Sequence, residues 1–228
     1  GWMMELRAEK ISQDFLRYSA KDGYFIAVQE TDFRLAAGTL TVVTGRSGSG
    51  KSTLLHILGG LMKPVTGRVF VDDVDLYAMG EDARTRLRSR RIGIVPQRLM
   101  SLAALSVREN ILLPALLTGE AERFAPRADE LMERLGIRKL ASVTPSELSG
   151  GEQRRVTIAR ALVMQPGILL ADEPTGDLDE ENTRSVLSLL RETADAGAAV
   201  LLVTHEREAA EYADVSYTMA AGVLTSNT

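Results

Sequence analysis

Gly45-Arg46-Ser47-Gly48-Ser49-Gly50-Lys51-Ser52-Thr53 is a glycine-rich stretch that fits the phosphate-binding loop pattern G-x-x-x-x-G-K-[ST], with an additional glycine at Gly48. Residues 39–44 are apolar and β-branched, which predicts a buried strand, and residues 54–58 predict the first turns of a helix. In this context glycines let the backbone wrap around a phosphate, and N–H groups at the helix start face it. We therefore predict a nucleoside triphosphate site here, rather than a chance glycine-rich turn. Lys51 would contact the β- and γ-phosphates, and the Ser52 hydroxyl would be a ligand of Mg²⁺.

The composition argues against several classes of protein. With 228 residues, 45% of them hydrophobic and 25% charged, the chain is long enough for one large soluble domain. Its net charge of −4 disfavours nucleic acid as the main partner, and we expect none. The absence of cysteine excludes disulfides and thiolate metal sites and suits a reducing compartment. The longest apolar runs, such as residues 111–117, are far shorter than the roughly 20 residues that span a bilayer, and we see no signal peptide, so we expect a cytoplasmic location.

Strands are expected on both sides of the glycine loop. The runs Tyr24–Val28 and Thr31–Leu35 are strand-like, with a tight turn expected near Asp22-Gly23. After the loop helix, residues 69–71 and Ile92–Val95 are predicted strands. The arginine-rich run just before Ile92–Val95 is predicted to be a solvated helix face.

The middle of the chain changes to a helical composition. Residues 98–146 are rich in Leu, Ala, Glu and Arg, and we expect Pro114 and Pro126 to break this segment into pieces. Residues 129–135 have amphipathic spacing that core packing explains. We interpret this segment as a helical subdomain inserted into a nucleotide-binding core.

The last third of the chain alternates helices and strands. The expected elements are a helix over Gly150–Met164, a strand over Ile168–Ala171, a helix over Glu180–Ala194 and a strand over Ala199–Val203. Such alternation predicts a mostly parallel sheet covered by helices.

Two acidic residues, Asp172 and Glu173, follow the predicted strand Ile168–Ala171 directly. Parallel sheets bind ligands at the carboxyl edge, where these acids would lie. We predict that Asp172 holds Mg²⁺, usually through water, and that Glu173 accepts a proton from an attacking water. The alternative is a pair of exposed acids that cap a loop.

A second glycine-containing helix start occurs at Leu148-Ser149-Gly150-Gly151-Glu152-Gln153. Ser149 is a plausible N-cap, and two glycines in the first turn would let an anion approach the backbone. Ser149 and Glu152 also form a capping-box pattern, which is the structural alternative. A capping box does not need two glycines, however, so we predict a second phosphate-binding helix start.

This hexapeptide, together with the phosphate loop before it and Asp172-Glu173 after it, closely resembles the signature of ATP-binding cassette (ABC) ATPases. The resemblance covers essentially the whole chain. It implies the α/β class, with a P-loop NTPase core on a mostly parallel sheet, an N-terminal antiparallel β-subdomain and an inserted helical subdomain. We place a single domain over residues 4–228, with its core in 4–97 and 148–228 and the helical subdomain in 98–147.

The resemblance also implies roles for residues outside these motifs. Gln97 matches the glutamine that links the Mg²⁺ and water site to the helical subdomain, and His205 matches the histidine that contacts the γ-phosphate. Tyr18 lies where the family places an aromatic residue on adenine, with Tyr24 as a rival for that role. The loop Gly176-Asp177-Leu178-Asp179 matches the loop that crosses the dimer interface, which adds Asp179 to the residues expected at the nucleotide.

Short motifs resemble a particular group within the family, the ATPases of lipoprotein-release, macrolide-export and peptide-antibiotic-resistance systems. These motifs are Gly59-Gly60-Leu61, Val107–Ile111 and Glu173–Gly176. The chain departs from that group in having Asp177 where asparagine is usual, Glu206 where aspartate is commoner, and Ala221-Gly222 in place of an Asp-Gly turn.

We therefore expect the ATPase subunit of a membrane transporter, which binds MgATP and hydrolyses it. A phosphate loop and a separate signature in one chain suggest a two-fold, head-to-tail homodimer, or a pseudo-dimer, in which each signature covers the other subunit's ATP. The partner would be a separate integral-membrane permease, with the subunit on the inner face of the membrane. A soluble ABC ATPase acting on DNA or ribosomes is the alternative, which the acidic charge, the short segment before Leu148 and the single cassette disfavour.

Overall fold

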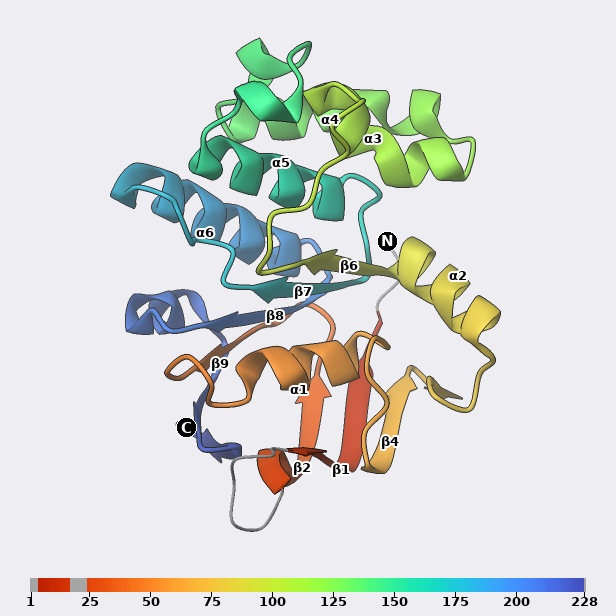
Figure 1. Cartoon of the computed structure of the whole chain (residues 1–228), viewed down its shortest axis with the longest axis vertical. Coiled ribbons are helices and arrows are strands. Elements are labelled where there is room, and N and C mark those ends of the chain that lie inside the picture. The colour runs from red at the N-terminus through yellow and green to blue at the C-terminus, as the bar shows by residue number, and fades with distance from the viewer. Residues whose placement is uncertain (1–3, 17–23, 228) are drawn as a thin grey trace.

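The strand before the glycine loop, β3 (Leu40–Thr44), lies inside a mostly parallel sheet of the computed structural model, which describes residues 4–16 and 24–227. Within these residues the strand order is β10-β9-β3-β8-β7-β6, and only the β9–β10 pair is antiparallel (Figure 1). The other strands are β6 (Ile92–Val95), β7 (Ile168–Asp172), β8 (Ala199–Thr204), β9 (Val215–Ala220) and β10 (Val223–Ser226). The predicted parallel sheet is confirmed.

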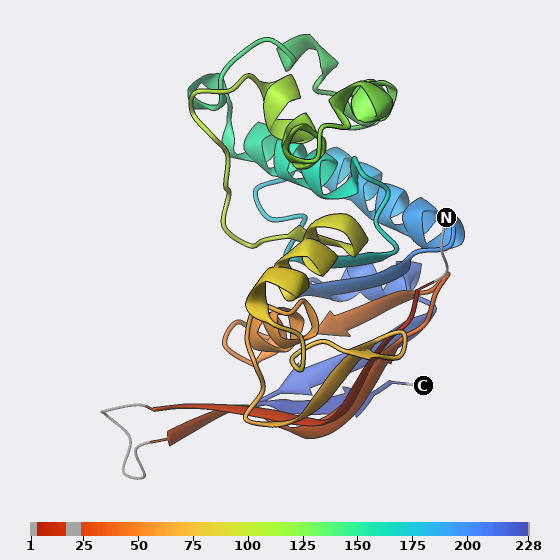
Figure 2. The same ribbon diagram turned by 90° about the vertical axis from the view of Figure 1, so that its right-hand side faces the viewer.

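A second, antiparallel sheet has the order β2-β1-β4-β5. Its strands are β1 (Leu6–Leu16), β2 (Tyr24–Leu35), β4 (Thr66–Val71) and β5 (Val74–Asp75). The two predicted runs in residues 24–35 form one strand, because register shifts in the β1–β2 pair absorb the irregular stretch between them. Figure 2 shows this sheet curving beneath the parallel one. The turn expected near Asp22-Gly23 lies outside the described residues.

Helices cover both faces of the parallel sheet. They are α1 (Lys51–Leu58), α2 (Glu81–Arg91), α3 (Val107–Leu117), α4 (Ala121–Arg134), α5 (Gly150–Leu162) and α6 (Glu180–Asp195), with short 3-10 turns η1 (Arg138–Leu140), η2 (Pro145–Glu147) and η3 (Arg207–Tyr212). In Figure 1, α3, α4 and α5 form a layer beyond the edge strand β6. None of the helices in the described part of the chain is long and apolar enough to cross a membrane.

The prediction that two prolines break the helical segment is wrong. Pro114 lies inside α3, and Pro126 lies inside α4. Each proline removes one backbone donor, but fully buried neighbours such as Ile111 and Leu131 keep the helices packed. The chain turns instead at Gly119, whose φ of 74° is in the left-handed region that glycine adopts without strain.

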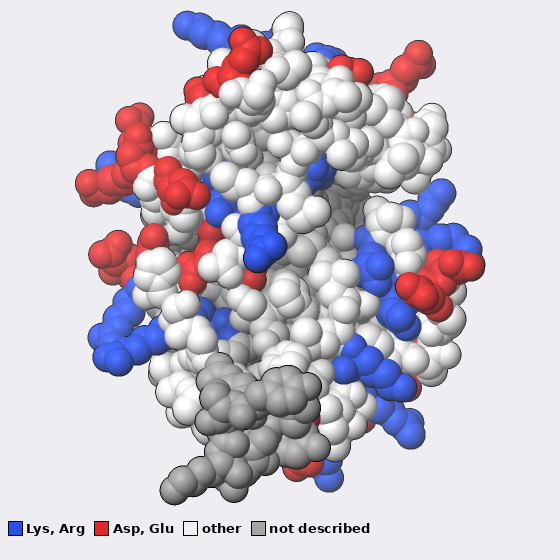
Figure 3. Space-filling model, in the orientation of Figure 1, with Lys and Arg blue, Asp and Glu red and all other residues white. Residues whose placement is uncertain are grey.

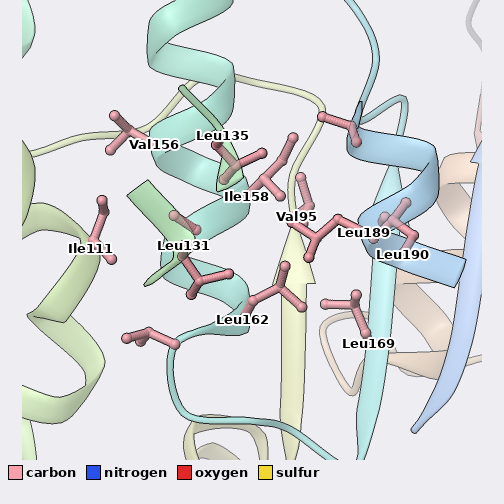
Figure 4. Packing of buried hydrophobic residues seen from close by; sticks show 14 of the residues in the cluster. Val95, Ile111, Leu131, Leu135, Val156, Ile158, Leu162, Leu169, Leu189 and Leu190 are labelled. Carbon is pink, nitrogen blue, oxygen red and sulfur yellow. The ribbon is translucent and has the colours of Figure 1, made fainter. Parts of the chain in front are cut away.

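The strands β3, β7 and β8 are buried along their whole length, so alternate side chains fill two clusters of buried hydrophobic residues in the described structure. One cluster joins one face of the parallel sheet to α3, α4, α5 and α6, and Figure 4 shows Leu169 of β7 within it, near Leu162 and Leu190. The other cluster joins the opposite face to α1 and the antiparallel sheet. The two clusters fix β3 and β7, and with them the loops that follow these strands.

Candidate functional site

The glycine loop connects β3 to α1, as the sequence predicts. Gly50 is the N-cap of α1 at φ 108°, and no side chain caps this helix start. A Cβ at Gly50 would lie 2.2 Å from the Ala27 carbonyl oxygen, so the close packing of the loop requires glycine there. The first N–H groups of α1 are therefore available to an anion, as in other phosphate-binding helix starts.

Lys51 is buried beneath the loop. Its ammonium donates hydrogen bonds to the carbonyl oxygens of Gly45 and Arg46, at 2.6 and 2.7 Å. Burial lowers the pKa of Lys51, and the charges of Glu173 and Asp172 oppose that shift. The loop thus holds a cation beside two carboxylates, although the lysine and the acids are more than a hundred residues apart in the sequence.

Asp172 lies at the end of β7 and is only 2% exposed. Burial raises the pKa of Asp172, and a hydrogen bond with Ser52 and the charge of His56 oppose this effect. Its Oδ1 atom is buried and has no hydrogen-bond partner in the described structure. Such an oxygen costs free energy unless a further group satisfies it.

The fit of Mg²⁺ rests on this oxygen. The described residues contain no group of three or more His, Cys, Asp or Glu that could hold a metal by themselves. Mg²⁺ does not require such a group, because it is usually bound by one or two carboxylates completed by phosphates and water. The Oδ1 atom of Asp172 and the neighbouring Ser52 hydroxyl fit that donor set.

Glu173 follows with a backbone φ of 47°, a strained value for a residue with a side chain. Its carboxylate is held from two sides. Thr204 Oγ1 donates to Oε2 at 3.0 Å, and the backbone N–H of His205 donates to Oε1 at 2.9 Å. The ring Nδ1 of His205 lies 3.1 Å from Oε2. The strain and the bonds fix the carboxylate at the edge of the sheet.

Gln97 follows β6, the neighbour of β7, so it leaves the sheet at the same edge as Asp172. The backbone carbonyls of Pro96 and Gln97 accept hydrogen bonds from the guanidinium of Arg154 in α5, at 2.9 and 2.8 Å. Arg154 and Thr204 were both missed from the sequence. Only the position of Thr204 directly before His205 could have indicated its contact with Glu173.

The second glycine-containing helix start is formed as predicted, and the hydroxyl of Ser149 caps the helix α5. Ser149 Oγ accepts from the N–H of Glu152 at 3.2 Å, and Glu152 Oε1 accepts from the N–H of Ser149 at 2.9 Å. The capping box and the glycines thus coexist. Gly150 and Gly151 pack against Asp177, and Asp179 caps α6 by accepting from the N–H of Asn182 at 2.8 Å.

Apart from Gln97, which follows β6 and is bonded to Arg154 of α5, the predicted site residues in the described structure form two groups. Residues 45–53, Asp172, Glu173 and His205 surround the start of α1, whereas Ser149–Glu152 and residues 176–179 surround the start of α5. Both helix starts lie on the side of the molecule toward which β6 and β7 point, but in different layers (Figure 1). Tyr18 lies outside the described residues, and Tyr24 begins β2.

Comparison with known proteins gives a consistent result. Residues 28–176 match the family described as ABC transporter. The chain is 39% identical to the lipoprotein-releasing system ATP-binding protein LolD of Idiomarina loihiensis, over 90% of each chain. It is 38% identical to the macrolide export ATP-binding/permease protein MacB of Agrobacterium fabrum, over 97% of this chain but only 34% of that protein.

Solved structures agree. A dimeric structure of MJ0796, a bacterial ABC transporter cassette, superposes with a TM-score of 0.87 at 30% identity and covers 95% of both chains. A dimeric structure of a post-hydrolysis state of MJ0796 bound to ADP and Pi gives the same TM-score at 28% identity. The chain belongs to the ABC transporter family and is an ATPase domain of that family.

Proposed function

We propose that the chain is the ATP-hydrolysing subunit of an ABC transporter and drives a separate membrane permease through ATP-dependent closure of a head-to-tail homodimer. The observation that carries this proposal is the position of the Glu173 carboxylate, held by Thr204 and His205 near Lys51 and Asp172. The LolD relative, which matches over 90% of both chains and is named as an ATP-binding protein of a lipoprotein-releasing system, supports it.

The nucleotide would bind at the start of α1. Backbone N–H groups of residues 45–53 would surround the phosphates, with the Lys51 ammonium on the β- and γ-phosphates. Tyr18 would stack on the adenine ring. Ser52, Asp172 and Gln97 would hold the Mg²⁺ that accompanies ATP. When bound, Mg²⁺ would neutralise charge that develops on the phosphate oxygens.

Hydrolysis would need a base and an orienting group close to the γ-phosphate. Glu173 would accept a proton from the attacking water, since its carboxylate is fixed at the sheet edge by two donors. His205, with its ring beside Glu173, would contact the γ-phosphate. Gln97 would orient the water from the neighbouring strand end.

The second helix start would act on the nucleotide of the other subunit. Ser149, Gly150 and Gly151 are open to solvent or half-buried, and their chain packs against the exposed Asp177. In a two-fold dimer each subunit would offer this surface, with Glu152 and Asp179, to its partner's ATP. The dimeric MJ0796 structures support such an assembly.

We further propose that residues 98–147 form the helical subdomain. Its first part, residues 98–117, would dock on the permease, and this contact would hold the subunit on the inner face of the membrane. The support is a group of exposed apolar side chains: Met100 is 60% exposed and Leu117 is 80% exposed. Acidic side chains gather on the left and at the top of the face in Figure 3 and basic ones along its right-hand edge, and the net charge of −4 disfavours DNA or RNA as the main partner.

Replacement of Glu173 tests the catalytic part of the proposal. Glu173→Gln keeps the shape of the side chain but cannot take up a proton, so ATP hydrolysis should fall by about 10²–10⁴. Because the change also removes a negative charge beside the γ-phosphate, the ATP-bound dimer should last longer on a sizing column. Glu208→Gln, at an exposed acid in η3, makes the same chemical change as a control. Near-normal turnover in Glu173→Gln would refute the assigned role.

Replacement of Met100 tests the docking surface. Met100→Glu should uncouple transport from hydrolysis while the basal ATPase activity stays, because it adds a charge to an apolar contact. Val223→Glu, at an exposed apolar residue of β10 that is 49% accessible, is the control. If Met100→Glu still copurifies and functions with the permease, the docking surface lies elsewhere.

A further inference from the structure

Arg154 is a charged side chain in a place where charge is costly. It lies in the second turn of α5 and is 4% exposed. Its two terminal nitrogens donate to consecutive backbone carbonyls, Nη1 to Pro96 and Nη2 to Gln97. The planar guanidinium fork thus fixes the backbone direction at the residue where the chain leaves β6.

The same guanidinium faces a third segment. Nη2 lies 3.7 Å from Oδ2 of Asp177, whose own backbone has a φ of 68° in the left-handed region. A Cβ at Gly176 would lie 3.6 Å from Nη2, and a Cβ at Gly151 would lie 3.0 Å from the Asp177 carbonyl oxygen. The loop of residues 176–179 is therefore packed between Arg154 and the glycines that begin α5.

Stability does not explain this arginine. Its Nε is buried without a hydrogen-bond partner in the described structure, and the carboxylate of Asp177 is 57% exposed and too distant for a hydrogen bond. Removing a guanidinium from water costs free energy that two carbonyls and one solvated carboxylate recover only in part. The two hydrogen bonds to Pro96 and Gln97 hold the backbone in place, but they do not account for a full charge at this position, which points to a role for the charge beyond stability.

We propose that Arg154 is a positioning residue that holds Gln97, the α5 start and Asp177 as one unit. This inference rests on the proposed function, in which Gln97 serves the subunit's own ATP and Ser149–Gly151 serve the partner's. Through Arg154 a movement at Gln97 moves the surface that the partner's nucleotide contacts. Each subunit then responds to both nucleotides of the dimer, and hydrolysis depends cooperatively on ATP.

Arg154 should affect the rate of ATP hydrolysis but not the binding of ATP. In the described structure Arg154 forms no hydrogen bond or ion pair with residues 45–53, so ATP binding by the isolated subunit should not need it. Displacement of catalytic groups by about 1 Å can cost roughly a hundredfold in rate. Loss of the fork should therefore lower kcat and the cooperativity and leave the affinity of the subunit for ATP unchanged.

Arg154→Met, which keeps the length and removes the charge, is the test variant, with Arg154→Lys as a cation that cannot form the fork. Arg155→Met is the matched control, because Arg155 is also in α5 but donates to Leu135 and Gly151 rather than to the Gln97 loop. We expect Arg154→Met and Arg154→Lys to lose about tenfold or more in kcat and the cooperative dependence on ATP, with unchanged affinity. Arg155→Met should keep both.

Amide hydrogen exchange gives a readout that does not depend on hydrolysis. Peptides covering residues 96–100 and 174–179 should exchange faster in both Arg154 variants than in the wild type, and not in Arg155→Met. Wild-type kcat and cooperativity in Arg154→Met, or unchanged exchange in these peptides, would overturn the inference. So would a loss of ATP affinity that matches the loss of kcat. The proposed function is tested separately, by comparing the ATPase activity of the wild type with that of Lys51→Ala. If the two activities were equal, the proposed function would fail, and the exchange measurement would still decide whether Arg154 links the two segments.

Discussion

The starts of α1 and α5 are two glycine-containing helix N-termini in one chain, and they are capped differently. Gly50 begins α1 in a left-handed conformation without a side-chain cap. Ser149 begins α5 with a reciprocal capping box to Glu152. Every helix start leaves N–H groups that need partners. At α1 those groups have no capping side chain, whereas at α5 the chain itself supplies two of the hydrogen bonds.

The two helix starts also differ in the charged residues that surround them. Lys51, Asp172 and Glu173 place one cation and two carboxylates around the start of α1. The α5 start has Glu152 in its cap and Asp177 packed on its glycines. We infer that the α1 end binds the nucleotide in the single subunit, and that the α5 end acts only when a partner brings its own nucleotide to it. Three substitutions test this division.

The largest effect is expected at α1. Lys51→Ala removes the ammonium that would contact two phosphates, a contribution of about 3 kcal/mol or roughly a hundredfold in affinity. Titration calorimetry of the subunit with MgATP measures the loss. Lys63→Ala removes an exposed lysine and should bind as the wild type does. Wild-type affinity in Lys51→Ala would remove α1 from the nucleotide site and so abolish the contrast with α5.

A smaller and different effect is expected at α5. Ser149→Ala removes an N-cap, which typically costs about 1 kcal/mol of stability. Ser106→Ala is a close control, because Ser106 and Glu109 form the same capping box at the start of α3. Both variants should lower the free energy of unfolding alike, but only Ser149→Ala should lower ATP hydrolysis, with ATP binding by the subunit unchanged. Equal hydrolysis in the two variants would mean that Ser149 is a cap and nothing more.

Much of this division could be predicted from the sequence because its determinants are local. The strand, glycine loop and helix around Lys51 follow one another, and Asp172 and Glu173 follow a buried strand directly. The same holds for the capping box, whose two members are three residues apart. Local order along the chain was enough to place each of these residues in the fold.

What could not be predicted depends on contacts between distant segments. Arg154 meets Pro96 and Gln97 across 58 and 57 residues, and Thr204 meets Glu173 across 31. Nothing in the local pattern of α5 indicates that this arginine is buried. The helix-breaking tendency of Pro114 is local, and it was overridden by burial of residues around it.

The smallest effect is expected at Asp172, whose buried carboxylate near the start of α1 costs free energy of folding. Burial raises the pKa of Asp172 in the folded chain, so the ionised carboxylate destabilises the fold. This cost is absent below the unfolded-state pKa, which is about 3.9, and is fully present above the raised folded-state pKa. Asp172→Asn should therefore be more stable than the wild type at pH 7, and the difference should shrink as the pH falls toward 4. Chemical denaturation at a series of pH values measures this difference in stability, with Asp73→Asn at an exposed turn as the control.

The same Asp172→Asn variant should hydrolyse MgATP more slowly, because it removes the oxygen proposed for Mg²⁺. Lower stability of Asp172→Asn at pH 7 would show that Ser52 and Lys51 compensate the buried charge already, and the α1 end would then carry no cost that a bound nucleotide must offset.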